Sequence, residues 1–535
     1  MKKIIKVMCI ILILGIIHIV LFTGCGNNAA GTSEELSTSS KINTNGKDLE
    51  SKVNITNAIK LKMLLIGDVA KDWDAIMVEF NKMSKKDLNA ELETVFVSWA
   101  DSTTKYPLMM MSGEELDLCF VANWQDYSKH CQRGAFISLD DYIQKYAPNA
   151  VKKLPKEAWN DVLVDGKTYS IPRYKYKYQN WGGVAVRGDL MKKYGITSIT
   201  STEDFGKYLD AVKINESVLI PLNAASEDWP AGLFDMFKVG MNYADLSVGG
   251  GLRYNALDEK PTIIYDYDDP DSIAWYKIAR DWYIKGYWSK NILNNKVKSM
   301  DAFNAGQGGA ACLGVNEFSN SYQIWNSKHP EWDVQFFPFN LEGNPYYTQS
   351  FNSTGLAVSV TSKNPERSVM LIDKFFESED YWNILAYGIK GIHWESTDDG
   401  KIQLPAGKLA DGYSQFYNCP WGYGDYQGFH KVSKSEWPKM EEFEKMLFEK
   451  AKPTPLRGFV ANTGSIKNEL AALETIKNTY GYSLTWGCAD PEVTVKKVMD
   501  EAKKAGLDKV MVEIQKQIDN FILSNLTVKS FRPDA

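Results

Sequence analysis

The stretch LKMLLIGDVAKDWDAIMVEFNKM (residues 61–83) contains the two kinds of regular structure that decide the fold. It opens with the short apolar run LKMLLI (residues 61–66), which is typical of a buried strand. From residue 74 onward, apolar side chains recur at the spacing of a helix, at Ile76, Met77, Phe80 and Met83. The stretch therefore predicts a strand that leads directly into an amphipathic helix.

Two further apolar runs, LETVFV (residues 92–97) and DLCFV (residues 117–121), predict the next strands. Strands that alternate with helices at this interval indicate a parallel sheet covered by helices, and ligands of such sheets bind beyond the carboxyl ends of the strands. Four candidate ligand contacts follow these ends: Asp68, Trp99, Asp101 and Trp124. The two tryptophans have an alternative role, which is to cap the sheet as packing residues.

The composition narrows the class of ligand. A net charge of -6 without basic clusters argues against nucleic acid, because phosphate binding relies on concentrated Lys and Arg. Aromatic residues make up 13% of the chain, which fits either a surface that stacks on flat, partly apolar ligands or simply large cores. The seven cysteines form no CxxC pair, so neither a zinc site nor a disulfide framework is predicted, and we expect no cofactor.

The N-terminus has the pattern of an export signal. Lys2, Lys3 and Lys6 precede an apolar run over residues 7–22, which predicts a secretory signal in residues 1–24. LFTGC, ending at Cys25, resembles a bacterial lipobox, in which acyl chains such as palmitate are attached to the cysteine. Phe22 stands where Leu is usual, so an uncleaved membrane anchor is the alternative. Residues 25–57 are mostly polar and predict a flexible tether.

Two motifs resemble sites of known chemistry, and a structural role fits both of them better. GQGGAA (residues 306–311) follows a predicted helix and precedes a predicted strand, which is the wrong order for a dinucleotide fingerprint. DYDDPD (residues 266–271) lacks the turn glycine of a calcium loop, so we expect an acidic or Ser cap for the helix that follows.

The chain shows no P-loop, GxSxG or HExxH motif and has only five histidines. A glycosidase needs two carboxylates that face a sugar, but no signal selects such a pair among the 67 acidic residues. No catalytic residue is therefore predicted. An exported glycan hydrolase is the enzyme alternative to a protein that only binds its ligand.

Two aromatic stretches are further candidates for ligand contact. RYKYKYQNWGG (residues 173–183) contains Tyr174, and CPWGYGDYQGF (residues 419–429) places Trp421 among glycines. Each stretch either displays its rings in a ligand-binding cleft or is buried between two parts of the folded protein. Trp229 and Trp394 are weaker candidates, for which a place in the core is the better interpretation.

The stretch DGKTYSIPRYKYKYQNWGGVAVRGDLMKKYGI (residues 165–196) resembles the interlobe crossing of extracellular solute-binding proteins of ABC importers, the type II class that includes many sugar binders. Residues 301–315 and 352–376 are similar to later segments of that family, in the expected order. Three more segments resemble a subgroup of large oligosaccharide-binding lipoproteins with a helical C-terminal domain: residues 381–395, 458–476 and 502–521.

This resemblance implies an α/β fold with two lobes of the periplasmic-binding-protein type, hinge crossings and a helical C-terminal region. Lobe 1 would comprise residues 58–175 and about 355–415, and lobe 2 about 176–354 and 416–535. The implied function is a lipid-anchored receptor, a monomer on the outer side of the cell membrane. It would capture an oligosaccharide and deliver it to an ABC permease, and a peptide or another polar metabolite is the alternative cargo.

Overall fold

The computed structural model describes residues 55–172, 182–226, 228, 232–338, 346–348, 350–408, 413, 427–429, 431–434 and 436–531. Its buried apolar side chains form two large clusters. The first core draws on residues 61–171 and 351–413, and the second core on residues 184–347 and 456–518. Each core thus combines segments that lie far apart in the sequence, so the chain passes between the cores more than once.

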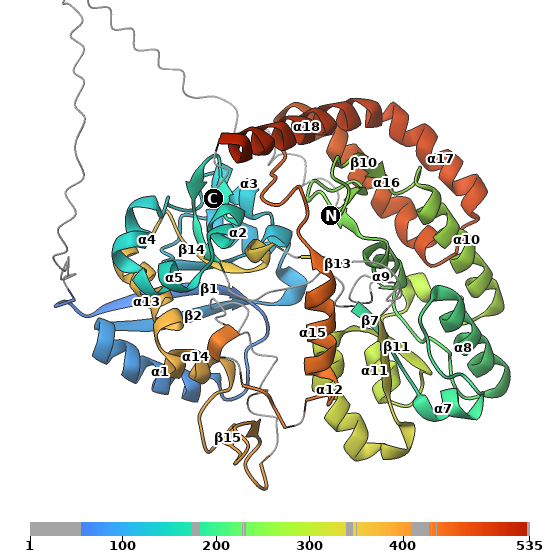
Figure 1. Cartoon of the computed structure of the whole chain (residues 1–535), viewed down its shortest axis with the longest axis horizontal. Coiled ribbons are helices and arrows are strands. Elements are labelled where there is room, and N and C mark those ends of the chain that lie inside the picture. Colours follow the sequence, from blue (N-terminus) through green and yellow to red (C-terminus); the bar gives the residue numbers. More distant parts are fainter. Residues whose placement is uncertain are drawn as a thin grey trace, which may run out of the picture. The chain divides into compact units, whose positions relative to one another are not determined.

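The sheet of the first core has the strand order β2-β1-β3-β14-β6. Its strands are β1 (Ile59–Ile66), β2 (Ala90–Val97), β3 (Leu118–Val121), β6 (Ser170–Pro172) and β14 (Gly355–Val358). β1 runs parallel to β2 and β3, as predicted. β14 runs antiparallel to β3 and β6, so the sheet is mixed rather than purely parallel. Figure 1 shows the gold β14 beside the blue strands of the same sheet.

The first predicted helix is α1 (Trp73–Leu88), which buries Ile76, Met77 and Phe80 as the sequence pattern requires. The other helices that contribute to the first core are α2 (Lys105–Met111), α3 (Tyr127–Gln132), α4 (Asp140–Tyr146), α5 (Pro148–Lys153), α6 (Lys156–Asp161), α13 (Pro365–Glu377) and α14 (Glu379–Ala386). Two short hairpins, β4 (Leu163–Val164) with β5 (Lys167–Thr168) and β15 (Glu395–Ser396) with β16 (Ile402–Gln403), complete this part.

The second core contains two antiparallel sheets of three strands. One has the order β11-β7-β12, from β7 (Gly182–Val186), β11 (Ala310–Gly314) and β12 (Gln335–Pro338). The other has the order β10-β9-β8, from β8 (Tyr243–Asp245), β9 (Leu252–Asn255) and β10 (Ile263–Tyr265). The helices around them are α7 (Gly188–Lys193), α8 (Thr202–Asn215), α9 (Gly232–Gly240), α10 (Pro270–Lys285), α11 (Ser299–Asn304), α12 (Val315–Lys328) and α15 (Met440–Lys450).

The strand β7 is buried on both faces, because successive side chains of a strand point to opposite sides. Val184 and Val186 belong to the second core, whereas Ala185 belongs to a third, smaller cluster with Trp437 and Leu447. This double burial explains why β7 reads as a continuous run of small and apolar residues.

The two motifs that resembled known sites are structural. Gly306 has a φ of 67° in the turn between α11 and β11, in the predicted order of helix, turn and strand. Asp269 is the N-cap of α10, and its carboxylate accepts hydrogen bonds of 2.8 Å from both the backbone and the hydroxyl of Ser272. Among the described residues, no group of three or more His, Cys, Asp or Glu could hold a metal ion.

Three of the cysteines that the structure describes are buried thiols: Cys119, Cys131 and Cys312. Burial raises the pKa of Cys119 and of Cys131 to about 12, so both stay protonated at physiological pH. Cys488 is half-buried and is also a free thiol.

The C-terminal helices are α16 (Lys467–Thr485), α17 (Pro491–Lys504) and α18 (Leu507–Phe531). Figure 1 shows α16 and α17, in shades of red, beside the green α10. Their inward side chains, among them Leu473, Val498 and Ile514, belong to the second core. In the part of the chain that the structure describes, no helix is both long enough and apolar enough to cross a membrane.

Candidate functional site

Four of the predicted contact residues lie at the carboxyl ends of β1, β2 and β3. Ile66 and Val97 are partners at the end of the β1–β2 pair, and the Gly67 N–H donates to the Val97 carbonyl oxygen at 2.9 Å. Because parallel strands end at the same edge of a sheet, the loops that carry Asp68, Trp99 and Trp124 meet there. Trp99 lies in the turn η1 (Trp99–Asp101), and Trp124 lies in the turn η2 (Asn123–Gln125).

The two tryptophan rings form a stacked pair. Their centroids are 6.2 Å apart, and the angle between the ring planes is 27°. The ring of Phe120, near the end of β3, packs against the ring of Trp124 at a centroid distance of 5.8 Å. Trp99 is 39% exposed and Trp124 is 44% exposed, so both rings are half in contact with protein and half open to solvent. Such a pair offers a flat apolar surface that the strand ends hold in place.

The indole of Trp124 is oriented by a hydrogen bond from its Nε1 to the carbonyl oxygen of Ser353, at 2.7 Å. Ser353 belongs to the turn η5 (Phe351–Ser353), which leads into β14. This bond joins residues 229 positions apart, so nothing in the local sequence around Trp124 announces it. A tryptophan whose polar edge is satisfied in this way loses little freedom when a ligand covers its ring.

Two carboxylates accompany the tryptophan pair. Asp101 lies in the same turn as Trp99, where the Ser98 hydroxyl donates to its Oδ2 at 3.1 Å. Asp68 follows Gly67, and both aspartates are exposed. A Cβ built on Gly67 would be 4.0 Å from Nε1 of Trp99, which shows how closely this loop passes the indole. The edge of the sheet thus offers hydrogen-bond acceptors next to an aromatic surface.

The turn η5 and the residue that follows it add two buried polar atoms that the sequence reasoning missed. Asn352 and Thr354 are 5% and 3% exposed, and neither Oδ1 of Asn352 nor Oγ1 of Thr354 has a hydrogen-bond partner. Gly355 pairs with Val121 of β3, which brings η5 to the strand end where Trp124 lies. Only the return of the chain through β14 creates this neighbourhood.

Trp394 is the one remaining predicted contact that the structure describes, and it lies in a separate buried cluster. Trp394 is buried with Trp382 and Tyr387, and its Nε1 donates to the Gly388 carbonyl oxygen at 3.0 Å. This burial agrees with the interpretation of Trp394 as a residue of the core rather than a ligand contact. Tyr174, Trp229 and Trp421 lie outside the described residues.

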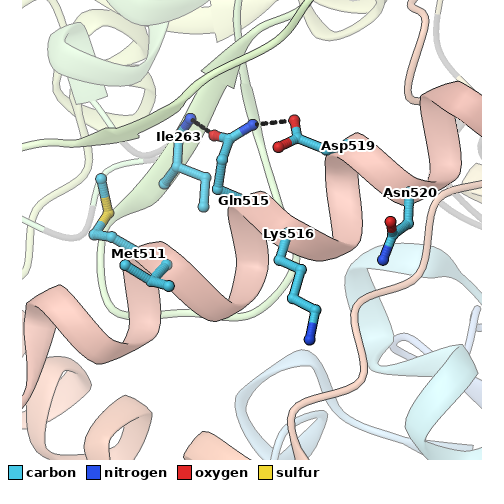
Figure 2. A pocket seen from close by; sticks show the side chains of 7 residues that line it. Ile263, Met511, Gln515, Lys516, Asp519 and Asn520 are labelled. Carbon is cyan, nitrogen blue, oxygen red and sulfur yellow. Dashed lines mark hydrogen bonds between the residues drawn. The ribbon is translucent and has the colours of Figure 1, made fainter.

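Two surface hollows lie elsewhere and contain none of the predicted contacts. A hollow of about 700 Å³ runs between α8 and α10 and is lined largely by charged side chains such as Lys207, Asp210 and Asp281. Figure 2 shows the second, about 510 Å³ in volume, along α18, where Gln515 is held by Ile263 and Asp519. Neither combines exposed aromatic rings with acceptors, so the tryptophan pair is the better candidate site.

Comparison with known proteins gives a consistent picture. Residues 67–381 match the family model described as bacterial extracellular solute-binding protein, and residues 455–523 match a domain of unknown function. A carbohydrate ABC transporter substrate-binding protein of Streptococcus pneumoniae is 25% identical over 86% of this chain and 91% of its own length. A polygalacturonan/rhamnogalacturonan-binding protein of Bacillus subtilis is 21% identical over 69% of this chain and 73% of its own length.

Solved structures confirm the predicted fold class. The N-glycan transport solute-binding protein of Streptococcus pneumoniae has a TM-score of 0.72 to this chain and is 22% identical, over 87% of this chain and 99% of its own. At this identity the likeness shows the fold alone, which is the α/β architecture of periplasmic binding proteins with added C-terminal helices.

Proposed function

Because this chain belongs to the bacterial extracellular solute-binding protein family, we propose that it captures a carbohydrate, in particular an oligosaccharide, and delivers it to an ABC permease. The names of its relatives support this proposal, since both curated proteins that it resembles are named for carbohydrate binding or transport. Proteins of this family bind a solute outside the cell and do not convert it.

The observation that carries the proposal is the exposed Trp99–Trp124 pair, with Asp68 and Asp101 beside it. The C–H faces of a sugar ring pack against aromatic rings, and its hydroxyls donate to carboxylate oxygens. We infer that these four residues contact the ligand. Tyr174, Trp229, Trp394 and Trp421 stay predictions.

We propose that the two cores correspond to two lobes, with residues 58–175 and about 355–415 in lobe 1, and about 176–354 and 416–535 in lobe 2. The division of the buried side chains into two large clusters supports this assignment. A ligand that contacts both lobes at once binds the closed form more tightly than the open form, which is the differential affinity that drives closure.

Calorimetry and tryptophan fluorescence with the purified full chain test the carbohydrate assignment. The panel contains Man5GlcNAc, fructo-nystose, oligogalacturonides and alginate oligomers, with tripeptides and pentapeptides as the alternative cargo. We expect saturable binding of at least one oligosaccharide and none of the peptides. Binding of peptides alone would overturn the carbohydrate assignment, and shortened glycan products would revive the hydrolase hypothesis.

We propose in addition that Cys25 carries the lipid that holds this monomeric receptor at the outer side of the cell membrane, with residues 26–57 as a tether. The basic and apolar pattern of residues 1–24 supports this, together with the small residue that precedes the cysteine. Residues 1–54 lie outside the described residues.

A further inference from the structure

The C-terminal helices, which match a domain of unknown function, are part of the second core. Trp275 of α10 donates from Nε1 to the Thr485 carbonyl oxygen at 3.0 Å, and Arg280 donates to the Gly487 carbonyl oxygen at 3.0 Å. On the other side of the domain, the Ile263 N–H of the edge strand β10 donates to Oε1 of Gln515 at 2.9 Å (Figure 2). The domain is therefore bonded to both α10 and β10.

The segment that leads into this domain runs beside one of the connections between the cores. The strand β13 (Tyr346–Tyr347) pairs in parallel with β17 (Ala451–Lys452). The Thr348 N–H extends this ladder by donating to the Lys452 carbonyl oxygen at 2.8 Å. After β13 the chain enters η5 and β14 of the first core, and after β17 it continues into the C-terminal domain. Two chain segments thus lie side by side where one of them leaves the second core.

Just beyond these paired strands, Asp161 at the end of α6 collects hydrogen bonds from both segments. From the β13 side, the Phe351 N–H donates to Oδ2 at 2.7 Å and the Ser350 hydroxyl donates to it at 3.0 Å. From the β17 side, Arg457 donates from Nε to Oδ1 at 2.9 Å and from Nη2 to Oδ2 at 3.1 Å. The guanidinium group of Arg457 also lies 4.9 Å from the centroid of the Phe351 ring.

The burial of this ion pair sets it apart from the surface pairs of the molecule. The Asp161 side chain is 0% exposed and the Arg457 side chain is 22% exposed. A buried carboxylate is tolerated only where charged and neutral donors replace its water, and this one has both. The planar guanidinium group of Arg457 fixes the direction from which the Asp161 carboxylate binds it, as well as the distance between the two groups. Breaking such a pair leaves an uncompensated buried charge, so the contact resists separation.

The pair connects the two cores. Ala158 of α6 belongs to the first core, whereas Leu456, which precedes Arg457, belongs to the second core. The two backbones also come close together at this junction. A Cβ built on Gly458 would lie 3.5 Å from the Asn160 carbonyl oxygen of α6. A strong contact between two bodies, placed where a connecting segment passes between them, limits the directions in which the bodies can rotate.

We propose that the C-terminal domain anchors lobe 2 to α6 of lobe 1 through the Asp161–Arg457 pair, and that this anchor is the pivot about which the lobes move. The inference rests on the proposed function for its effect on ligand binding. With a fixed pivot, the lobes of the unliganded protein can adopt fewer relative orientations than without one. Less conformational entropy is therefore lost when a ligand brings the two lobes together. Asp161 and Arg457 are therefore positioning residues, and neither is among the proposed ligand contacts.

Spin labels test the pivot in the full chain. One label replaces Val78 on α1, and the other replaces Ile214 on α8, because both side chains are exposed. Asp161→Asn removes the charge at Asp161 and Arg457→Lys removes the planar fork, and both retain a similar volume. We expect either variant to broaden the distribution of label distances without ligand, and to weaken binding of the panel oligosaccharide that binds the wild type by about tenfold.

Lys509→Met is the matched control, because it breaks the Glu469–Lys509 pair of 2.6 Å, which lies within the C-terminal domain. It should change neither the distance distribution nor the affinity. Distributions as narrow as the wild type in both Asp161→Asn and Arg457→Lys would overturn the pivot. If the wild type bound no oligosaccharide, the proposed function would fail, while the label distances would still decide whether the pivot exists.

Discussion

At the scale of single residues, the clearest expectation concerns Trp99. Its ring is 39% exposed and stacks on Trp124, so Trp99→Ala removes contact surface without opening a closed core. We expect the affinity for the bound oligosaccharide to fall about tenfold, or roughly 1.4 kcal/mol, with little change in melting temperature. Titration calorimetry measures the first quantity and calorimetric unfolding the second. Unchanged affinity would remove Trp99 from the site.

Trp394 provides the contrast, because it is a tryptophan of the same predicted role in a buried setting. Its ring packs against Tyr387 at a centroid distance of 5.8 Å, and its indole is satisfied by Gly388. We expect Trp394→Ala to destabilise the fold by roughly 3–5 kcal/mol, through the cavity that it leaves. Denaturant unfolding measures this loss. If Trp394→Phe kept its stability but lost affinity, the prediction that Trp394 contacts the ligand would gain support over the core interpretation.

His130 on α3 makes the stability depend on pH. It is 4% exposed, its Nδ1 has no hydrogen-bond partner, and burial lowers its pKa below the ordinary value of 6.5. Arg133 and Lys129 lower this pKa further, while Asp126 opposes them. The unfolded chain then binds the proton more tightly than the folded protein, so acid favours unfolding.

We expect His130 to contribute a loss of unfolding free energy as the pH falls from 7.5 through 6.5 toward the lower folded pKa. Comparing the melting temperatures of the wild type and His130→Gln at pH 7.5 and 5.5 isolates this contribution from other titrating groups. A drop between the two pH values that is as large in the variant as in the wild type would contradict it.

At the scale of elements, the turn between α16 and α17 is fixed by a close approach of backbones. Gly487 has a φ of 67°, and a Cβ there would overlap the Ala279 carbonyl oxygen of α10. Gly391 has a φ of 82°, but a Cβ there would meet nothing within 4 Å. The two glycines therefore share the unfavourable backbone conformation and differ in the space around it.

We expect Gly391→Ala to lower the unfolding free energy by about 1–2 kcal/mol, from the backbone conformation alone. Gly487→Ala should lose about 1–3 kcal/mol more, because α10 and the C-terminal helices must move apart. Urea unfolding of the two variants measures the difference. Equal losses would show that α10 adjusts to the added methyl group.

At the scale of the whole molecule, the remaining expectation concerns attachment to the cell. Cys25→Ala should abolish labelling with radioactive palmitate and release the protein from the membrane fraction, because the acyl chains on Cys25 are the proposed membrane anchor. The wild type is the control for both measurements. A wild type that stays in the membrane without lipid label would favour the uncleaved anchor instead.

Much of the fold could be predicted because the relevant signals are local. The strand and helix of residues 61–83 follow from side-chain spacing, and the observed β1 and α1 differ from the prediction only at their ends. The cap at Asp269 and the turn at Gly306 also depend on residues within a few positions. Neighbouring residues in the chain determine the backbone at these points, so a single sequence suffices.

Other features depend on contacts that no local pattern encodes. Whether a tryptophan is displayed, as Trp99 is, or buried, as Trp394 is, depends on what the rest of the chain packs against it. The antiparallel insertion of β14 beside β3 makes the sheet mixed and brings Ser353 to Trp124. The sequence shows Asp161 and Arg457 as two ordinary charged residues 296 positions apart.

By itself the sequence determined the α/β class, the order of the elements and the family, because these rest on periodicity, capping and the order of segments along the chain. Only the tertiary structure decided which side chains form the candidate site and which charges join the two cores. The reason is physical: burial, stacking and ion pairing are properties of distance in space, and the return of the chain through β14 and the C-terminal domain sets those distances.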